Sequence, residues 1–325
     1  MNEMTDKISI CQYSMISGGS LNAKSVRCEH HGALIRADYG GVFGYGCIHP
    51  WPELGDQSLD KTLSMLAEGR HTALSARAME CAQRDAQARE EGVSLFDGLV
   101  VPRSHATLMM NEDDFEMAVH AGFTTVKVKV GRSPAVEADF IRAQAKIYPE
   151  LMWRLDFNGS LDPKAVESLL ADLGEEVRDK IDFLEDAFLP GITPWVDALG
   201  PYDIAMAVDR EVEDACGSYG VAVIKPALNQ PSPLLERVAD EGKRAVITSY
   251  MDHPLGQSFA ALEAAHAYQS FPKFVDTCGL ITHGLFEQNE FTAALGAARP
   301  SFNPPSGTGL GFDELLETSL WKPLS

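Results

Sequence analysis

Residues 124–129, Thr-Thr-Val-Lys-Val-Lys, are the stretch of this chain that decides the fold. β-Branched residues favour a β-strand, and a side-chain period of two places Lys127 and Lys129 on the same face of that strand. Two neighbouring cations on an otherwise apolar strand are costly unless anions lie opposite them. We therefore expect carboxylates on the strands that follow.

Three later apolar runs supply these anions, because each ends in a carboxylate. The runs are Trp153-Arg154-Leu155-Asp156, Phe183-Leu184-Glu185-Asp186 and Ala207-Val208-Asp209. The next run, Val223-Ile224-Lys225-Pro226, carries a third lysine. Two lysine-bearing strands thus flank three strands that end in acids, and we expect the lysines to face each other across one opening.

From Val101 onward, short apolar runs alternate with amphipathic stretches, a pattern typical of strands joined by helices. The strands are predicted at 106–110, 124–130, 152–157, 181–187, 204–208, 221–224, 245–250 and, most weakly, 279–282. Helices are predicted at 112–121, 134–147, 163–173, 233–241, 255–267 and 285–295, with short pieces near 194–199 and after 211. Eight such units are what a (β/α)₈ barrel needs, so the predicted fold class is α/β. A doubly wound open sheet is the alternative.

The first 100 residues follow a different pattern. Short β-like runs at 8–15, 33–37 and 42–48 precede a region from Ser58 to Glu90 with apolar residues at helical spacing. We predict an α+β capping domain over residues 1–100 and a barrel over 101–302. The tail, about 303–325, is predicted to fold back on the capping domain. His30 and His31 are interpreted as a solvated strand edge.

Composition limits the classes of function. The 325 residues carry a formal net charge of −20, which argues against nucleic acid and disfavours an anionic membrane surface. A small anionic substrate stays compatible, because local lysines can outweigh a distant acidic exterior. Six scattered cysteines without a C-x-x-C pair indicate reduced thiols, and the N-terminus resembles no signal peptide. We expect a cytoplasmic protein.

Strand ends in such a barrel meet at one mouth, which brings the acids together. Three converging carboxylates need a cation, and hard oxygen ligands suit Mg²⁺. A buried lysine beside cations has a lowered pKa and can act as a base. Lysines opposed across a divalent ion suit removal of a proton next to a carboxylate.

These motifs resemble the muconate-lactonizing subgroup of the enolase superfamily. The resemblance rests on Lys127-x-Lys129, Arg154-x-Asp156-x-Asn158, Glu185-Asp186, Asp209 and Ile224-Lys225-Pro226, in that order over most of 101–300. Within the subgroup, the stretches 223–228 and 248–256 are most similar to the o-succinylbenzoate synthases. That family implies dehydration of a small carboxylate, 2-succinyl-6-hydroxy-2,4-cyclohexadiene-1-carboxylate, to o-succinylbenzoate, a menaquinone precursor.

The resemblance also implies a role for each matching residue. Lys129 would be the general base, Lys225 would stabilise the enolate from the opposite side, and Lys127 would support the carboxylate charge and lower the pKa of Lys129. Further implied roles are Mg²⁺ ligation by Asp156, Glu185 and Asp209, orientation of the ligands by Arg154 and Asn158, and substrate contacts by Ser249 and Gly279.

Two departures leave the substrate open. The interval from Asp209 to Lys225 is short, and the seventh predicted strand ends in Ser249-Tyr250-Met251-Asp252 where many relatives have a glycine and a glutamate. Relatives that racemise N-acylamino acids or epimerise dipeptides use the same two lysines, so such an isomerase is the alternative. A descendant that binds a small anion without turnover is a third possibility.

Overall fold

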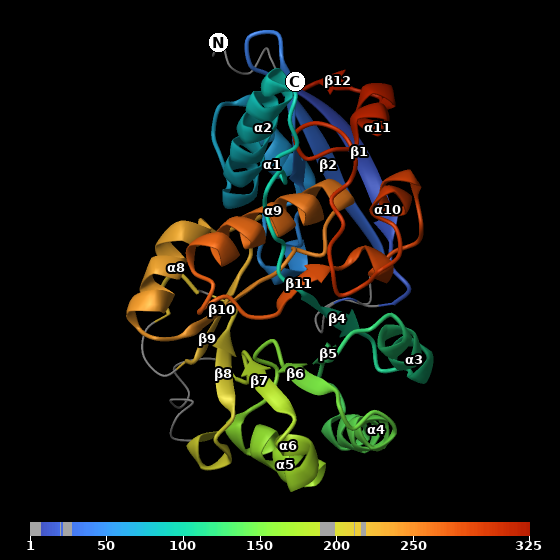
Figure 1. Ribbon diagram of the computed structural model, residues 1–325, viewed down its shortest axis with the longest axis vertical. Helices are drawn as coiled ribbons and strands as arrows, with labels where there is room; N and C mark the ends of the chain where they lie inside the picture. Colours follow the sequence, from blue (N-terminus) through green and yellow to red (C-terminus); the bar gives the residue numbers. More distant parts are fainter. Residues whose placement is uncertain (1–7, 20, 22–27, 189–198, 211, 216–218) are drawn as a thin grey trace.

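The computed structural model places the chain in two layers, a small sheet with its helices and a larger ring of strands (Figure 1). Its strands form a four-stranded antiparallel sheet and an eight-stranded parallel sheet. The residues described are 8–19, 21, 28–188, 199–210, 212–215 and 219–325.

The smaller sheet has the strand order β12-β1-β2-β3, with β1 at Ile8–Ile16, β2 at Glu29–Asp38, β3 at Phe43–Ile48 and β12 at Lys322–Pro323. The C-terminal tail lies against the first strand, because Ile10 pairs with Lys322. Helices α1 (Leu59–Ala67) and α2 (Ala73–Glu91) follow the sheet, after a short 3₁₀ turn, η2 (Pro52–Leu54). Glycines let α2 approach β3: a Cβ at Gly44 would lie 1.8 Å from the carbonyl oxygen of Ala82.

The eight parallel strands form the predicted barrel. They are β4 (Ser104–Leu108), β5 (Thr125–Lys129), β6 (Met152–Asp156), β7 (Ile181–Glu185), β8 (Ala205–Val208), β9 (Val221–Ile224), β10 (Arg244–Ile247) and β11 (Cys278–Ile281). Their order is β10-β9-β8-β7-β6-β5-β4-β11. Parallel bridges from Ala245 to Val275 and from Thr248 to Gly279 close the ring. The (β/α)₈ prediction is confirmed, including its weakest strand, and the open-sheet alternative is wrong.

Helices cover the outside of this ring (Figure 1). They are α3 (Glu112–His120), α4 (Pro134–Ile147), α5 (Pro163–Leu173), α6 (Glu175–Arg178), α8 (Pro231–Asp240), α9 (Pro254–Ser270) and α10 (Glu290–Leu295). Two 3₁₀ turns, η3 (Gly200–Tyr202) and η4 (His283–Leu285), lie between barrel elements. The tail contains one further helix, α11 (Asp313–Thr318), which lies beside β12 (Figure 1). The predicted helix over 285–295 is shorter in the structure, because Asn289 caps a new start. Most of the predicted short piece near 194–199 and parts of the one after 211 lie outside the described residues.

Apolar side chains form part of the barrel interior. Phe183, Val221, Val223 and Val246 make a buried cluster there with Ala207. Charges near such a cluster interact strongly, because little solvent screens them.

Helix α9 and the capping domain share a buried interface. The Trp51 indole donates to the carbonyl oxygen of Tyr250 at 2.8 Å, and Arg77 of α2 contacts Glu263 of α9 at 3.0 Å. His30 also packs here, with its ring 4.5 Å from that of Trp51. The interpretation of His30 as a solvated edge is wrong, because this aromatic cluster covers it; His31 is exposed as expected. The domain boundaries at residues 100 and 302 stay a prediction.

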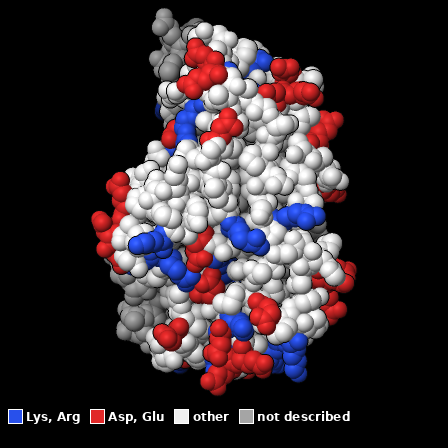
Figure 2. Space-filling model, in the orientation of Figure 1, with Lys and Arg blue, Asp and Glu red and all other residues white. Residues whose placement is uncertain are grey.

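The acidic surplus lies on the surface. On the face shown in Figure 2, acidic side chains gather over α5 and α6 at one end, while the surface over α9 is largely uncharged. Among the described cysteines, the thiols of Cys11, Cys47, Cys81 and Cys278 are free. Among the described helices, none is long and apolar enough to cross a bilayer.

Candidate active site

A cavity of about 470 Å³ opens at the C-terminal ends of the barrel strands. Most of the residues singled out in the sequence line it, namely Lys127, Lys129, Asp156, Asn158, Asp209, Lys225, Ser249 and Gly279. Glu185 lies just beneath the lining, 1% exposed. The strand-end positions predicted from the sequence therefore do converge on one pocket.

Strand register explains why these side chains meet. In the strand register, Lys129 on β5 lies opposite Asp156 on β6, and Asp156 lies opposite Glu185 on β7, so three charged residues form one row across these strands. Asp209 and Lys225 follow directly after β8 and β9 and continue the row. Because parallel strands present alternate residues to the barrel interior, every member of the row points inward.

Ion pairs tie the row together. The Lys127 Nζ lies 2.5 Å from Glu185 Oε1 and 3.1 Å from Asp156 Oδ2. The Lys225 Nζ lies 2.5 Å from Asp209 Oδ2. Each of the three carboxylates thus has an ammonium partner.

Lys129 differs from the other two lysines because no carboxylate of the described residues forms a salt bridge with it. Burial lowers its pKa, the Asp156 carboxylate opposes this shift, and the cations of Lys127 and Lys225 lower the pKa further. Burial also acts to lower the pKa of Lys127, but the carboxylates of Asp156 and Glu185 outweigh it and raise that pKa. Lys129 is therefore the lysine best suited to lose its proton.

The carboxylates carry more negative charge than the lysines offset. Burial raises the pKa of Glu185 to about 7, with Lys127 opposing and the charges of Asp156 and Asp209 adding to the rise. Burial, then Asp209 and Glu185, raises the pKa of Asp186 to about 8. Asp156 behaves differently, because Lys127 and Lys129 outweigh its burial and lower its pKa. Burial and mutual repulsion thus make Glu185 and Asp186 hold a proton more readily.

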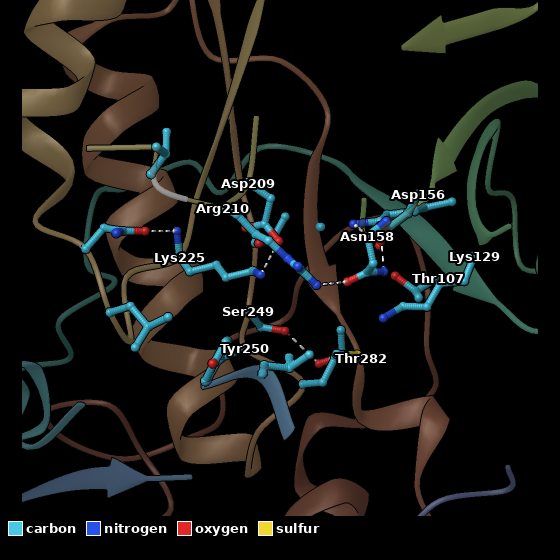
Figure 3. Close-up of a pocket in the computed structure, with 18 of the residues that line it drawn as sticks. Thr107, Lys129, Asp156, Asn158, Asp209, Arg210, Lys225, Ser249, Tyr250 and Thr282 are labelled. Carbon is cyan, nitrogen blue, oxygen red and sulfur yellow. Dashed lines mark hydrogen bonds and ion pairs between the residues drawn. The ribbon is translucent and has the colours of Figure 1, made fainter. Parts of the chain in front are cut away.

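Lys129 and Lys225 enter the pocket from opposite sides, as Figure 3 shows, with Asp156 and Asp209 nearby. Several contacts fix Lys225: its backbone N–H donates to Asn229 Oδ1 at 3.0 Å, and its ammonium lies 5.5 Å from the centre of the Tyr250 ring. The capping domain contributes too, since the Arg77 Nε donates to the carbonyl oxygen of Pro226 at 2.8 Å. This contact joins residues 149 positions apart.

Two residues with strained backbone, one after β6 and one after β7, support the carboxylates. Asn158 and Asp186 both have positive φ, at 50° and 44°. The Asn158 amide donates to Asp156 Oδ1 at 2.8 Å, and Asp186 Oδ1 accepts the backbone N–H of Asp209 at 3.1 Å. The Asn158 amide thus contacts the Asp156 carboxylate, and its role in orienting a metal ligand stays a prediction. The similar function of Asp186 was missed, although it directly follows Glu185.

Arg154 does not line the pocket but lies one pleat deeper, 1% exposed. Its guanidinium donates to Asp182 Oδ2, to His105 Nδ1 and to the carbonyl oxygen of Thr277, each at 2.7 Å. Arg154 therefore contacts groups on β4, on β7 and directly before β11, rather than the carboxylates at the mouth.

The wall opposite the carboxylates carries neutral polar groups. Ser249 Oγ and Thr282 Oγ1 lie 2.7 Å apart, and the Ser249 N–H donates to the carbonyl oxygen of Gly279 at 3.0 Å. Gln257 of α9 accepts from the backbone N–H groups of Thr282 and His283 at 3.1 and 2.8 Å. Sequence reasoning missed Gln257, Thr282 and His105; the alternation of His105 with Thr107 on the first barrel strand was the one usable signal.

The donor set fits a divalent metal ion, and Asp156, Glu185 and Asp209 are the residues that could hold it. Carboxylate oxygens are the ligands Mg²⁺ prefers, and burial together with the charges of Asp156 and Asp209 raises the pKa of Glu185, a shift that a bound cation would oppose. No ready cluster of three His, Cys, Asp or Glu side chains is found among the described residues. Lysine ammonium groups neutralise the carboxylates instead.

Comparisons with known proteins show which folds and families resemble this chain. The chain is similar to the dipeptide epimerase of Enterococcus faecalis complexed with Mg and a dipeptide, with a TM-score of 0.76, 16% identity, and coverage of 95% of this chain and 99% of that one. It is also similar to the o-succinylbenzoate synthase of Thermosynechococcus elongatus complexed with Mg in the active site, with a TM-score of 0.65, 21% identity, and coverage of 87% and 94%. The fold is thus that of the enolase-superfamily enzymes, a barrel with a capping domain.

Sequence likeness narrows this class to a family. Residues 8–88 match the model of the O-succinylbenzoate synthase N-terminal domain. An o-succinylbenzoate synthase of Bdellovibrio bacteriovorus is 32% identical over 98% of both chains. The chain belongs to the o-succinylbenzoate synthase family, whose members are lyases.

Proposed function

We propose that this protein dehydrates 2-succinyl-6-hydroxy-2,4-cyclohexadiene-1-carboxylate to o-succinylbenzoate, as a member of the muconate-lactonizing subgroup. The observation that carries the proposal is Lys129, a buried lysine of lowered pKa facing Lys225 across a pocket lined by carboxylates. The full-length likeness to a synthase of this name supports it. The pathway, menaquinone biosynthesis, and a cytoplasmic location belong to the same proposal.

Asp156, Glu185 and Asp209 are proposed to hold Mg²⁺. Bound there, the ion would supply positive charge to the substrate carboxylate as negative charge develops on it. The protein contributes the rigid frame, because the Asn158 amide and the Asp186 carboxylate fix the two outer ligands through the hydrogen bonds described above.

The lysines are proposed to move and balance the proton. The neutral Lys129 amine takes the proton from the ring carbon that bears the carboxylate, and the electron pair of that C–H bond moves toward the carboxylate, which becomes an enediolate. The pair then returns to the ring and forms the new C–C double bond as the C–O bond to the neighbouring hydroxyl breaks, and protonated Lys129 gives its proton to the departing oxygen, which leaves as water. Lys127 holds the pKa of Lys129 down, and Lys225 stabilises the transient negative charge from the other side.

An isomerase of N-acylamino acids or dipeptides is the second candidate, favoured by the opposed lysines and by the structural likeness to a dipeptide epimerase. Such a reaction needs both lysines to exchange protons with the substrate. The full-length likeness to an o-succinylbenzoate synthase, at 32% identity, favours the dehydration.

An ultraviolet assay tests the proposal, because dehydration makes an aromatic ring and changes the absorbance. We expect turnover with Mg²⁺, loss of turnover with a chelator, and loss of turnover in Lys129→Ala with an unchanged circular dichroism spectrum. Lys146→Ala, on the exposed side of α4, is the matched control. Substantial activity in Lys129→Ala would remove this residue as the base.

The isomerase is tested by exchange of α-deuterium from both enantiomers of N-succinylamino acids and dipeptides. Exchange without any dehydration of the cyclohexadiene would replace the proposed substrate and keep the proton chemistry. Binding of either ligand class without turnover would point to the non-catalytic alternative.

A further inference from the structure

His105 on β4 is a buried group of the pocket that the proposed proton chemistry does not use. It is 2% exposed and lines the cavity at the lower end of the strand, two residues before Thr107. Within the described part of the chain, its ring has one hydrogen bond, which joins its Nδ1 to the guanidinium Nη1 of Arg154 at 2.7 Å. The state of the ring follows from this partner.

Arginine has only donors, so the Nδ1 of His105 must be the acceptor of that bond. A neutral imidazole that accepts at Nδ1 carries its proton on Nε2. Arg154 is itself held in place, because its Nε donates to Asp182 Oδ2 at 2.7 Å and its Nη1 also donates to the carbonyl oxygen of Thr277 at 2.7 Å. The ring is thus fixed in one tautomer by a guanidinium that has little freedom to move.

The surroundings also keep His105 neutral. Burial lowers its pKa well below the usual value, and the positive charges of Arg154 and Lys127 lower it further. Nδ1 is engaged and the ring is uncharged, so it offers neither a base nor a cation to the pocket. Its remaining polar group is the Nε2–H donor.

Nε2 lies against Gly279. A Cβ built at Gly279 would lie 2.8 Å from His105 Nε2, 2.7 Å from its Cε1 and 2.7 Å from Thr248 Cγ2, which is closer than side-chain carbons approach, so only glycine leaves the imidazole its place. Both Gly279 and His105 line the cavity, so the Nε2–H is the polar group that the ring can offer to a ligand there. Strands β4 and β11 are neighbours, and β6, β7 and β8, which lead to the carboxylates, lie across the barrel from β11.

We propose that His105, held in its Nε2–H tautomer by Arg154, donates a hydrogen bond to an oxygen of the substrate's succinyl group. This inference rests on the proposed function, in which the ring carboxylate lies at Asp156, Glu185 and Asp209 on the opposite side. The oxygen near Gly279 then belongs to the other end of the substrate, either its ketone or its terminal carboxylate. A fixed neutral donor adds selectivity for that oxygen without adding charge to a site already crowded with lysines.

Two substitutions separate the donor from the structural contact. In His105→Asn, the amide oxygen takes the position of Nδ1 and can accept from Arg154, but the Nε2–H is gone. In His105→Gln, the longer amide places an N–H near the position of Nε2. Binding is measured by calorimetry in the presence of Mg²⁺, with o-succinylbenzoate, 2-(3-carboxypropyl)benzoate, which lacks the ketone, and 2-butanoylbenzoate, which lacks the terminal carboxylate.

We expect His105→Asn to weaken o-succinylbenzoate binding, by a few-fold to about tenfold for a ketone acceptor and about ten- to a hundredfold for a carboxylate. The loss should vanish for the one analogue that lacks the acceptor, and His105→Gln should regain part of it. An equal loss for all three ligands, or none for o-succinylbenzoate, would overturn the assignment. Failure of the wild-type protein to bind o-succinylbenzoate would instead overturn the proposed function.

The tautomer has a test that needs no ligand. Nitrogen-15 spectra of the imidazoles at neutral pH, with the His105 signals among the nine histidines identified by their absence in His105→Asn, should show a neutral ring protonated at Nε2. A ring protonated at Nδ1, or at both nitrogens, would refute the proposal whatever the substrate.

Discussion

Replacement of Lys127 by methionine should make the stability of the protein depend on Mg²⁺. The Lys127 Nζ lies 2.5 Å from Glu185 and 3.1 Å from Asp156, and the three side chains are only 11%, 2% and 7% exposed. Removing one partner of a buried ion pair leaves an uncompensated charge and costs about 3–5 kcal/mol. We expect a loss near the lower end of this range at neutral pH, because Glu185 can relieve the strain by taking a proton.

Mg²⁺ should reverse this loss more strongly in Lys127→Met than in the wild type. The ion would bring positive charge back to the same carboxylates without repulsion from an ammonium. Binding to the folded state alone adds about 2.7 kcal/mol at a hundredfold excess over Kd. Urea unfolding with chelator and with Mg²⁺ gives both increments, and Lys146→Met on the exposed face of α4 is the control. Equal Mg²⁺ increments in variant and wild type, or a variant as stable as wild type in chelator, would refute the reasoning.

Three other outcomes are expected. In chelator, the free energy of unfolding should fall as the pH rises from 6.5 to 8. Glu185 and Asp186 have folded pKa values of about 7 and 8 against 4.5 and 3.8 in the unfolded chain, so the folded protein binds protons that the unfolded chain has released. Urea titrations should show a slope of up to ~1.4 kcal/mol per pH unit for each group, and Mg²⁺ should flatten this slope. Arg77→Ala should lower kcat in the ultraviolet assay as well as stability, because the residue fixes the peptide after Lys225; a loss of stability with unchanged kcat would argue against this link. Gly279→Ala should cost about 1–3 kcal/mol of stability, read from urea midpoints, because the added methyl group overlaps His105 and Thr248, and it should weaken product binding by displacing the imidazole; an unchanged affinity would contradict the contact assigned to His105.

The strand-end residues could be predicted because their placement is a local property. A period of two and the common direction of parallel strands suffice to bring Lys129, Asp156, Asp209 and Lys225 to one mouth, and the structure places them there. Their pairing could not be predicted, since it depends on side-chain reach across strands. Sequence pattern alone gives no reason for Lys127 to bind Asp156 and Glu185 while Lys129 stays without a salt bridge among the described residues.

Depth along a strand is the second quantity that sequence pattern leaves open. Arg154 and Asp156 share a face by the same period of two, so both were expected to act at the metal ligands. One pleat separates them, and this places Arg154 below the mouth, against His105 and Thr277. The role of His105 could not be predicted either, because it depends on side-chain reach to Arg154, two strands away on β6.

The capping domain has a share in the chemistry that goes beyond covering the pocket. Arg77 of α2 is 4% exposed and reaches across the interface to the carbonyl oxygen that follows Lys225, while its other nitrogens bind Glu80, Gln230 and Glu263. A guanidinium with this many partners holds one position, so the Pro226 peptide is fixed by a residue of the other domain. Any movement of the cap away from the barrel would therefore shift Lys225 relative to Lys129. Opening of the cap and loss of the opposed-lysine geometry are thus expected to be one event.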